Sequence, residues 1–145
     1  MSTLEKAIAL ATKKHAGQLD KAGQPYILHP LRLMLNVENM DQKMVAVMHD
    51  LLEDTDTTIV DLITLGFSQN VIDAVVALTK KEGESRLDAA KRIVKNSLAR
   101  TVKLADLADN MDLSRIKSPT QRDFMRLEEY KKVKDFLLNP PAALI

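Results

Sequence analysis

The chain contains no cysteine, and this absence removes several kinds of chemistry at once. Disulfide frameworks, thiolate nucleophiles and cysteine-ligated zinc sites are all excluded. Glycine and proline are scarce, with four and five copies in 145 residues, and aromatic residues make up only 3%. A chain with few helix breakers, few aromatics and many Leu, Ala, Lys and Met residues favours helices over a sheet.

The chain also lacks a surplus of charge of either sign, with 21 basic against 20 acidic residues and a net charge of +1. It therefore has no electrostatic footprint for duplex nucleic acid, and we expect no nucleic-acid partner. No apolar run approaches the roughly 18 residues of a membrane span. Residues 1–14 mix charged with apolar residues, unlike a signal peptide. We expect a cytoplasmic protein without a membrane contact.

What is present is an ordinary globular composition, 46% hydrophobic and 28% charged, which excludes wholesale disorder. The length suits one domain. We expect a single domain over residues 1–145, with its core at about 3–138 and a C-terminal tail at 139–145. Apolar residues recur at helical spacing along most of the chain. The predicted fold class is all-α, an irregular single-domain bundle of seven or eight helices.

One predicted helix begins with a cap at Asp41 and is apolar on nearly every side through residues 44–52, which indicates a central, buried helix. The exceptions are His49 and Asp50. A charged pair inside such a helix is costly unless it is compensated. A cation that both side chains can reach would compensate it.

Two further residues are candidate ligands of the same cation. His29 stands near the start of the preceding predicted helix, and Asp106 lies among apolar residues much later in the chain. Two imidazoles and two carboxylates form a mixed nitrogen and oxygen set that suits Mn²⁺, Fe²⁺ or Zn²⁺. The remaining histidine, His15, has no acidic neighbour in the sequence, and we interpret it as a structural residue.

Two more carboxylates, Glu53 and Asp54, end the same predicted helix. Residues four apart share a helix face, so Glu53 should lie beside His49. By the same spacing, Asp54 should lie beside Asp50. The carboxylates would then stand next to the predicted metal, where one of them can manage the proton of an attacking water. The pattern therefore predicts metal-dependent hydrolysis.

Three segments of the chain resemble the blocks of the hydrolase domain of RelA/SpoT homologues, a domain of the HD phosphohydrolase superfamily. They are Tyr26-Ile-Leu-His-Pro30, Met48-His-Asp-Leu-Leu-Glu-Asp-Thr55 and Val102-Lys-Leu-Ala-Asp106. The resemblance covers about residues 3–138, and the length is similar to that of the stand-alone small alarmone hydrolases. It implies an HD-type fold and a Mn²⁺-dependent enzyme. The implied reaction removes the 3′-diphosphate of (p)ppGpp as pyrophosphate and leaves GDP or GTP.

The resemblance also implies roles for single residues. The implied metal ligands are His29, His49, Asp50 and Asp106; the implied catalytic pair, which orients or deprotonates water, is Glu53 and Asp54; and the implied substrate-binding residues are Lys21, Asn110, Arg126 and Tyr130. Asp109, beside Asn110, is interpreted as a surface acid. Asp20 stands where many members have an arginine that packs on the purine, and a carboxylate cannot stack in that way. The identity of the base is therefore open.

Two other functions also stay open. The chain could hydrolyse another nucleotide, such as the adenosine alarmone (p)ppApp, NADPH or a nucleoside monophosphate. It could instead be a catalytically silent nucleotide-binding module, although a binder does not need Glu53 and Asp54. In each case we expect a small-molecule nucleotide as the partner, with a homodimer left open.

Overall fold

The computed structural model describes residues 2–144, and over that range it is all-helical. The helices are α1 (Leu4–Lys14), α2 (Leu28–Leu35), α3 (Met40–Met48), α4 (Leu51–Asp54), α5 (Ile59–Thr64), α6 (Gln69–Leu78), α7 (Arg86–Ile93), α8 (Ser97–Asn110) and α9 (Gln121–Leu138), with 3₁₀ turns at Leu113–Arg115 and Ala142–Leu144. The predicted all-α class is confirmed. None of the helices within residues 2–144 is both long and apolar enough to cross a membrane.

Polar caps explain why several of these helices begin where they do. Reciprocal capping boxes open three of them, with Asn39 and Gln42 at α3, Thr58 and Asp61 at α5, and Thr120 and Asp123 at α9. Each box satisfies two backbone N–H groups that a helix start leaves without partners. After α5 the chain turns at Gly66, whose φ of 87° lies in the left-handed region that glycine tolerates best.

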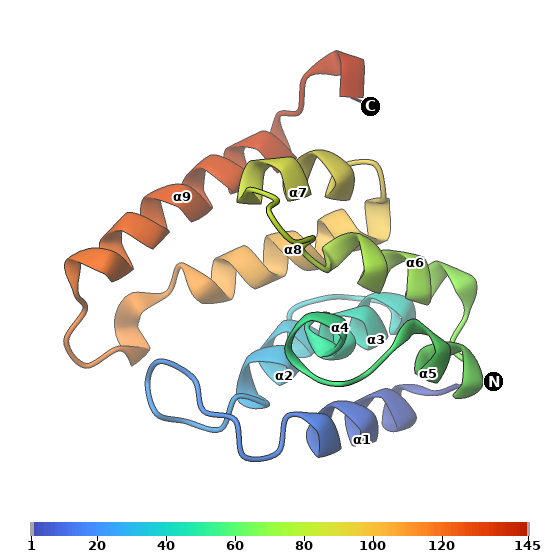
Figure 1. The fold of residues 1–145 in the computed structure, drawn as a ribbon. Helices are drawn as coiled ribbons and strands as arrows, with labels where there is room; N and C mark the ends of the chain where they lie inside the picture. Colours follow the sequence, from blue (N-terminus) through green and yellow to red (C-terminus); the bar gives the residue numbers. More distant parts are fainter. Residues whose placement is uncertain (1, 145) are drawn as a thin grey trace.

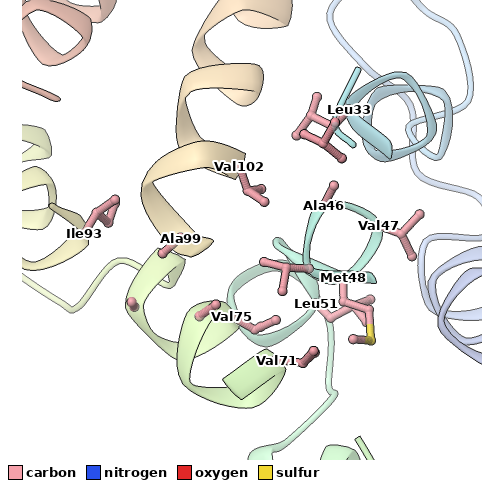
Figure 2. Packing of buried hydrophobic residues seen from close by; sticks show 14 of the residues in the cluster. Leu33, Ala46, Val47, Met48, Leu51, Val71, Val75, Ile93, Ala99 and Val102 are labelled. Carbon is pink, nitrogen blue, oxygen red and sulfur yellow. The ribbon is translucent and has the colours of Figure 1, made fainter. Parts of the chain in front are cut away.

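Helix α3 lies at the centre of the bundle and packs against α1, α2, α6 and α8 (Figure 1). Its residues 45–48 are all fully buried, so every side of the helix meets another element. Figure 2 shows these side chains against residues from the surrounding helices; the labelled ones are Leu33, Ala46, Val47, Met48, Leu51, Val71, Val75, Ile93, Ala99 and Val102. The central, buried helix predicted from the sequence is therefore present.

That helix is shorter than predicted. It begins after Asn39 rather than Asp41 and ends at Met48, and the chain turns at His49 and Asp50 before α4 starts. In a continuous helix the Ala46 carbonyl would accept from the N–H of Asp50. It accepts instead from Nδ1 of His49, at 2.7 Å. The residues expected to carry chemistry thus sit at a break in the helix.

Two connections far apart in the sequence lie at the same end of the molecule. The loop over residues 15–27, between α1 and α2, faces the connection that leads from α8 to α9 (Figure 1). Residues of both connections line one cavity. The fold therefore brings the break in the central helix, the early loop and the late connection together.

We expect Leu33→Ala to lower the free energy of unfolding by about 2–5 kcal/mol, because it leaves a cavity beside the central helix. The matched control is Leu35→Ala in the same helix, since Leu33 is 0% exposed and Leu35 is 74% exposed. Urea unfolding of both variants measures the difference. Equal losses would contradict the packing described for α2.

Candidate active site

The four residues predicted to bind a metal come together in space. His29 near the start of α2 and Asp106 in α8 meet, with Nε2 and Oδ1 2.9 Å apart. Nε2 of His49 lies 3.1 Å from Oδ2 of Asp50 and 3.5 Å from Oδ1 of Asp106. His29, His49 and Asp106 are buried. Ligand atoms of His29, His49 and Asp106 thus lie within 4.8 Å of one another, and Asp50 meets this group through His49.

Nδ1 of each imidazole, the nitrogen that faces away from the cluster, contacts a hydrogen-bond acceptor. Nδ1 of His29 lies 2.6 Å from Oδ2 of Asp109, and Nδ1 of His49 lies 2.7 Å from the Ala46 carbonyl. An ionised carboxylate and a carbonyl only accept, so each Nδ1 carries a proton and the Nε2 atoms are the ones that face the carboxylates of the cluster.

The donor set fits a divalent metal ion. Within the described residues, the buried Nε2 of His49 has no hydrogen-bond partner, although it faces two carboxylates. An unpartnered buried nitrogen is costly, and metal coordination is one way to satisfy it. Two imidazole nitrogens with two carboxylate oxygens suit a first-row divalent ion.

Electrostatics also favour positive charge at this point. Burial by itself would lower the pKa of His49, but Asp50 and Asp106 raise that pKa well above its usual value. Burial would raise the pKa of Asp106, yet Lys103 and the two imidazoles hold it well below its usual value. The buried carboxylates therefore require cations beside them, which protons or a metal ion can supply.

Sequence reasoning missed two residues that hold these ligands in place. Nζ of Lys103 lies 2.9 Å from Oδ2 of Asp106, one helical turn before it on α8. The hydroxyl of Tyr26 donates to Oδ2 of Asp50. A signal existed for Lys103, because residues three apart share a helix face. The contact between Tyr26 and Asp50 crosses from one loop to another and has no local signal.

The interpretation of Asp109 as a surface acid is wrong. Its side chain is only 8% exposed and receives two hydrogen bonds from Arg32, at 2.8 and 3.0 Å, besides its contact with His29. Burial opposes ionisation, but His29 and Arg32 hold the pKa of Asp109 below its usual range. The physical reason is the helical repeat, which brings Asp109 to the face of α8 that carries Asp106.

The two carboxylates of the predicted catalytic pair, Glu53 and Asp54, lie beside Asp50, one of the predicted metal ligands. Oxygen atoms of Asp50, Glu53 and Asp54 all lie within 4.8 Å of one another. The expected pairing of Glu53 with His49 is not found, because the helix break groups Glu53 with the two aspartates. Burial, followed by the neighbouring Asp50 and Glu53 carboxylates, raises the pKa of Asp54 to about 6.

A cavity of about 450 Å³ opens onto this cluster. It is lined by all but one of the predicted site residues, namely Lys21, His29, Asp50, Glu53, Asp54, Asp106, Asn110, Arg126 and Tyr130. The exception is His49, which lies behind the others. Asn110 donates from Nδ2 to Oδ1 of Asp106, at 3.1 Å, so it touches the metal cluster as well as the cavity.

One part of the cavity is basic. Burial lowers the pKa of Lys21, and the nearby Arg126 and Arg86 lower it further. Arg86, the first residue of α7, lies with its guanidinium 5.2 Å from the centre of the Tyr130 ring and pairs with Glu129. Sequence reasoning did not identify Arg86. The cavity therefore joins a carboxylate-rich part to a part that suits phosphate groups.

Asp20, the residue that departs from the RelA/SpoT pattern, supports its own loop. Its Oδ1 accepts from the backbone N–H groups of Ala22 and Gln24, both at 2.9 Å. The side chain also lines the cavity. One carboxylate oxygen is thus committed to the turn that presents Lys21.

No family model matches the chain. The chain is 34% identical over 118 residues to guanosine-3′,5′-bis(diphosphate) 3′-pyrophosphohydrolase of Aquifex aeolicus, a match over 75% of this chain and 17% of the relative. It is 35% identical over 92 residues to the bifunctional (p)ppGpp synthase/hydrolase SpoT of Escherichia coli, over 61% of this chain and 12% of that protein. The chain therefore spans less than a fifth of the length of these curated relatives.

A solved structure gives a likeness over nearly the whole chain. It is that of a metazoan SpoT orthologue described as hydrolysing ppGpp, with a TM-score of 0.80 and 25% identity over 99% of this chain and 90% of that one. The all-α architecture and the His–Asp cluster define an HD-type hydrolase-like domain. Within that class, the chain is a domain of the RelA/SpoT hydrolase kind, as the sequence motifs predicted.

We expect Asp109→Asn to weaken Mn²⁺ binding about tenfold or more, because it removes the charge behind the ligand His29. The matched control is Asp88→Asn, an exposed aspartate on α7 that makes a long contact with Lys91, at 3.9 Å. Isothermal titration of each metal-free variant with Mn²⁺ gives the affinities. If both variants bind as the wild type does, Asp109 does not support the metal cluster.

Proposed function

We propose that this chain hydrolyses the 3′-diphosphate of (p)ppGpp, releasing pyrophosphate and leaving GDP or GTP. The observation that carries the proposal is the cavity in which a His29–His49–Asp106 cluster, an acidic group of Asp50, Glu53 and Asp54, and a basic part meet. The relatives' described activities support the same reaction. The single domain over residues 1–145, the cytoplasmic location and the homodimer stay predictions.

The proposed metal is Mn²⁺, with Fe²⁺ and Zn²⁺ as alternatives. His29, His49, Asp50 and Asp106 would hold it, since atoms of His29, His49 and Asp106 already lie within 4.8 Å of one another and Asp50 contacts His49. When bound, such an ion supplies positive charge to a phosphate oxygen and lowers the pKa of water. Carboxylate oxygens make up half of the donors, which suits Mn²⁺ better than a purely imidazole site would.

Asp54 is the better of the two candidates for proton transfer. Its pKa of about 6 lies near neutrality, where a general base is most effective. Glu53 accepts a hydrogen bond from the backbone N–H of Lys80, at 2.9 Å, which ties α4 to the end of α6. We therefore assign the proton to Asp54 and the orientation of water and of α4 to Glu53.

The basic part of the cavity would bind the phosphates. Lys21 and Arg126 supply charge, and Asn110 and Tyr130 supply neutral hydrogen-bonding groups. Asp123 pairs with Arg126, with Oδ1 and Nη2 2.7 Å apart, and holds its guanidinium in the absence of substrate. Charge-assisted hydrogen bonds to phosphate are the stronger kind, so this part of the cavity favours polyphosphorylated nucleotides over monophosphates.

The function is tested by incubating Mn²⁺-loaded protein with ppGpp, ppApp, NADPH and GMP and identifying the products by chromatography. We expect pyrophosphate and GDP from ppGpp. Orthophosphate from NADPH or GMP as the main product would support hydrolysis of another nucleotide. Nucleotide binding without turnover of any of them would support a silent module. Either result would overturn the proposal.

The catalytic pair is tested by Glu53→Gln and Asp54→Asn, which keep the shape of each side chain and remove its charge. We expect kcat to fall about 10²-fold or more while Mn²⁺ stays bound, the usual scale for loss of acid–base catalysis. Asp56→Asn is the matched control, because Asp56 is 83% exposed and pairs with Lys14. If metal content falls in proportion to activity, the two residues are ligands or supports of ligands instead.

A further inference from the structure

His15 is a buried side chain for which the proposed mechanism has no use. It lies at the C-terminal end of α1, is 2% exposed and belongs to no metal cluster among the described residues. Burying a histidine costs free energy unless its polar atoms find partners. Only Nδ1 of His15 has one, in Gln18, while Nε2 has none within residues 2–144. A leucine or phenylalanine would fill the same space without this cost.

Gln18 connects His15 to the catalytic pair. Nε2 of Gln18 donates to the carbonyl of Asp54, at 3.2 Å, and Oε1 of Gln18 lies 2.8 Å from Nδ1 of His15. A carbonyl only accepts, so the Asp54 contact fixes which end of the amide faces His15. Nδ1 of His15 must therefore carry the proton and donate it to Gln18. The imidazole thus determines how Gln18 meets the end of α4.

Tyr26 connects the same imidazole to the metal ligands. Its ring packs near two histidines, with centroids 4.9 Å from His15 and 5.7 Å from His29. Its hydroxyl donates to Oδ2 of Asp50, the oxygen that faces His49. The direction of that hydroxyl depends on the ring, and His15 is one of the side chains against which the ring packs.

These two connections end on elements that do not hold themselves in place. Helix α4 is a single turn of four residues, too short to be stable without outside contacts. Asp50 lies in the turn that breaks the central helix. Both elements need contacts from another part of the chain; Gln18 and Tyr26 provide one to each, and both of these residues contact His15.

We propose that His15 is a positioning residue, which orients Asp54 through Gln18 and orients Asp50 through Tyr26. The part that concerns Asp54 rests on the proposed function, whereas the part that concerns Asp50 rests on the metal cluster alone. His15 touches neither substrate nor metal in this proposal. It couples the geometry of the acid–base group to that of the metal ligand.

Two substitutions of His15 separate the connection through Gln18 from the connection through Tyr26. His15→Phe keeps a ring against Tyr26 and removes the donor to Gln18. His15→Asn keeps a donor near the position of Nδ1 and removes the ring. Gln18→Leu breaks the connection to Asp54 at Gln18 itself. Tyr26→Phe breaks the connection to Asp50 at the hydroxyl of Tyr26. Gln24→Leu is the matched control, because Gln24 is an exposed glutamine in the same loop and does not line the cavity.

We expect His15→Phe and Gln18→Leu to lower kcat for ppGpp about tenfold with Mn²⁺ affinity unchanged, since misplaced catalytic groups cost rate. We expect His15→Asn and Tyr26→Phe to weaken Mn²⁺ binding about tenfold in calorimetric titration, the scale of lost support for a ligand. Gln24→Leu should match the wild type in both measurements. Thermal unfolding shows which variants are folded, and Gln18→Leu and Tyr26→Phe carry the test if the His15 variants are not.

Wild-type kcat in Gln18→Leu and His15→Phe would overturn the proposal, as would equal losses in Gln18→Leu and Gln24→Leu. If the wild type does not release pyrophosphate from ppGpp, the proposed function fails. The Mn²⁺ titrations then still test whether His15 positions Asp50. Unchanged Mn²⁺ affinity in His15→Asn and Tyr26→Phe would then overturn the role of His15.

Discussion

The candidate site is organised by the positive charge that the buried carboxylate of Asp106 requires beside it. Asp106 is buried in α8, and its oxygens face Lys103, His29 and His49. An isolated buried carboxylate is far too costly to persist, so each cation around it is held against it by the same electrostatic demand. The cluster is therefore stable as a set of charges and remains able to exchange proton charge for metal charge.

The break at the end of the central helix places polar residues of the candidate site at the edge of the core. Residues 45–48 at the end of helix α3 are fully buried in the middle of the core. The turn at His49 and Asp50 ends the helix at the edge of the cavity. The rigid core thus holds one end of the site, and short segments that depend on tertiary contacts hold the other.

The basic part of the cavity depends on a different balance of charges. Arg86, Arg126 and Lys21 come from three separate segments and repel one another, and Asp123 and Glu129 offset part of that repulsion. A polyanionic substrate would complete the neutralisation. At both parts of the cavity, the fold has placed charged side chains close together, and a ligand of the opposite charge would neutralise them.

The sequence by itself determined the all-α class and the buried central helix, and it singled out His29, His49, Asp50 and Asp106 as candidate ligands near one another. Helical periodicity and the cost of charge among apolar residues are local signals, and they carry this information. Only the tertiary structure decided that the helix breaks at His49, that Asp109 lies buried behind His29, and that Tyr26 reaches Asp50. Those features arise from contacts between segments far apart in the chain, whose energies depend on distance and burial that no local pattern encodes.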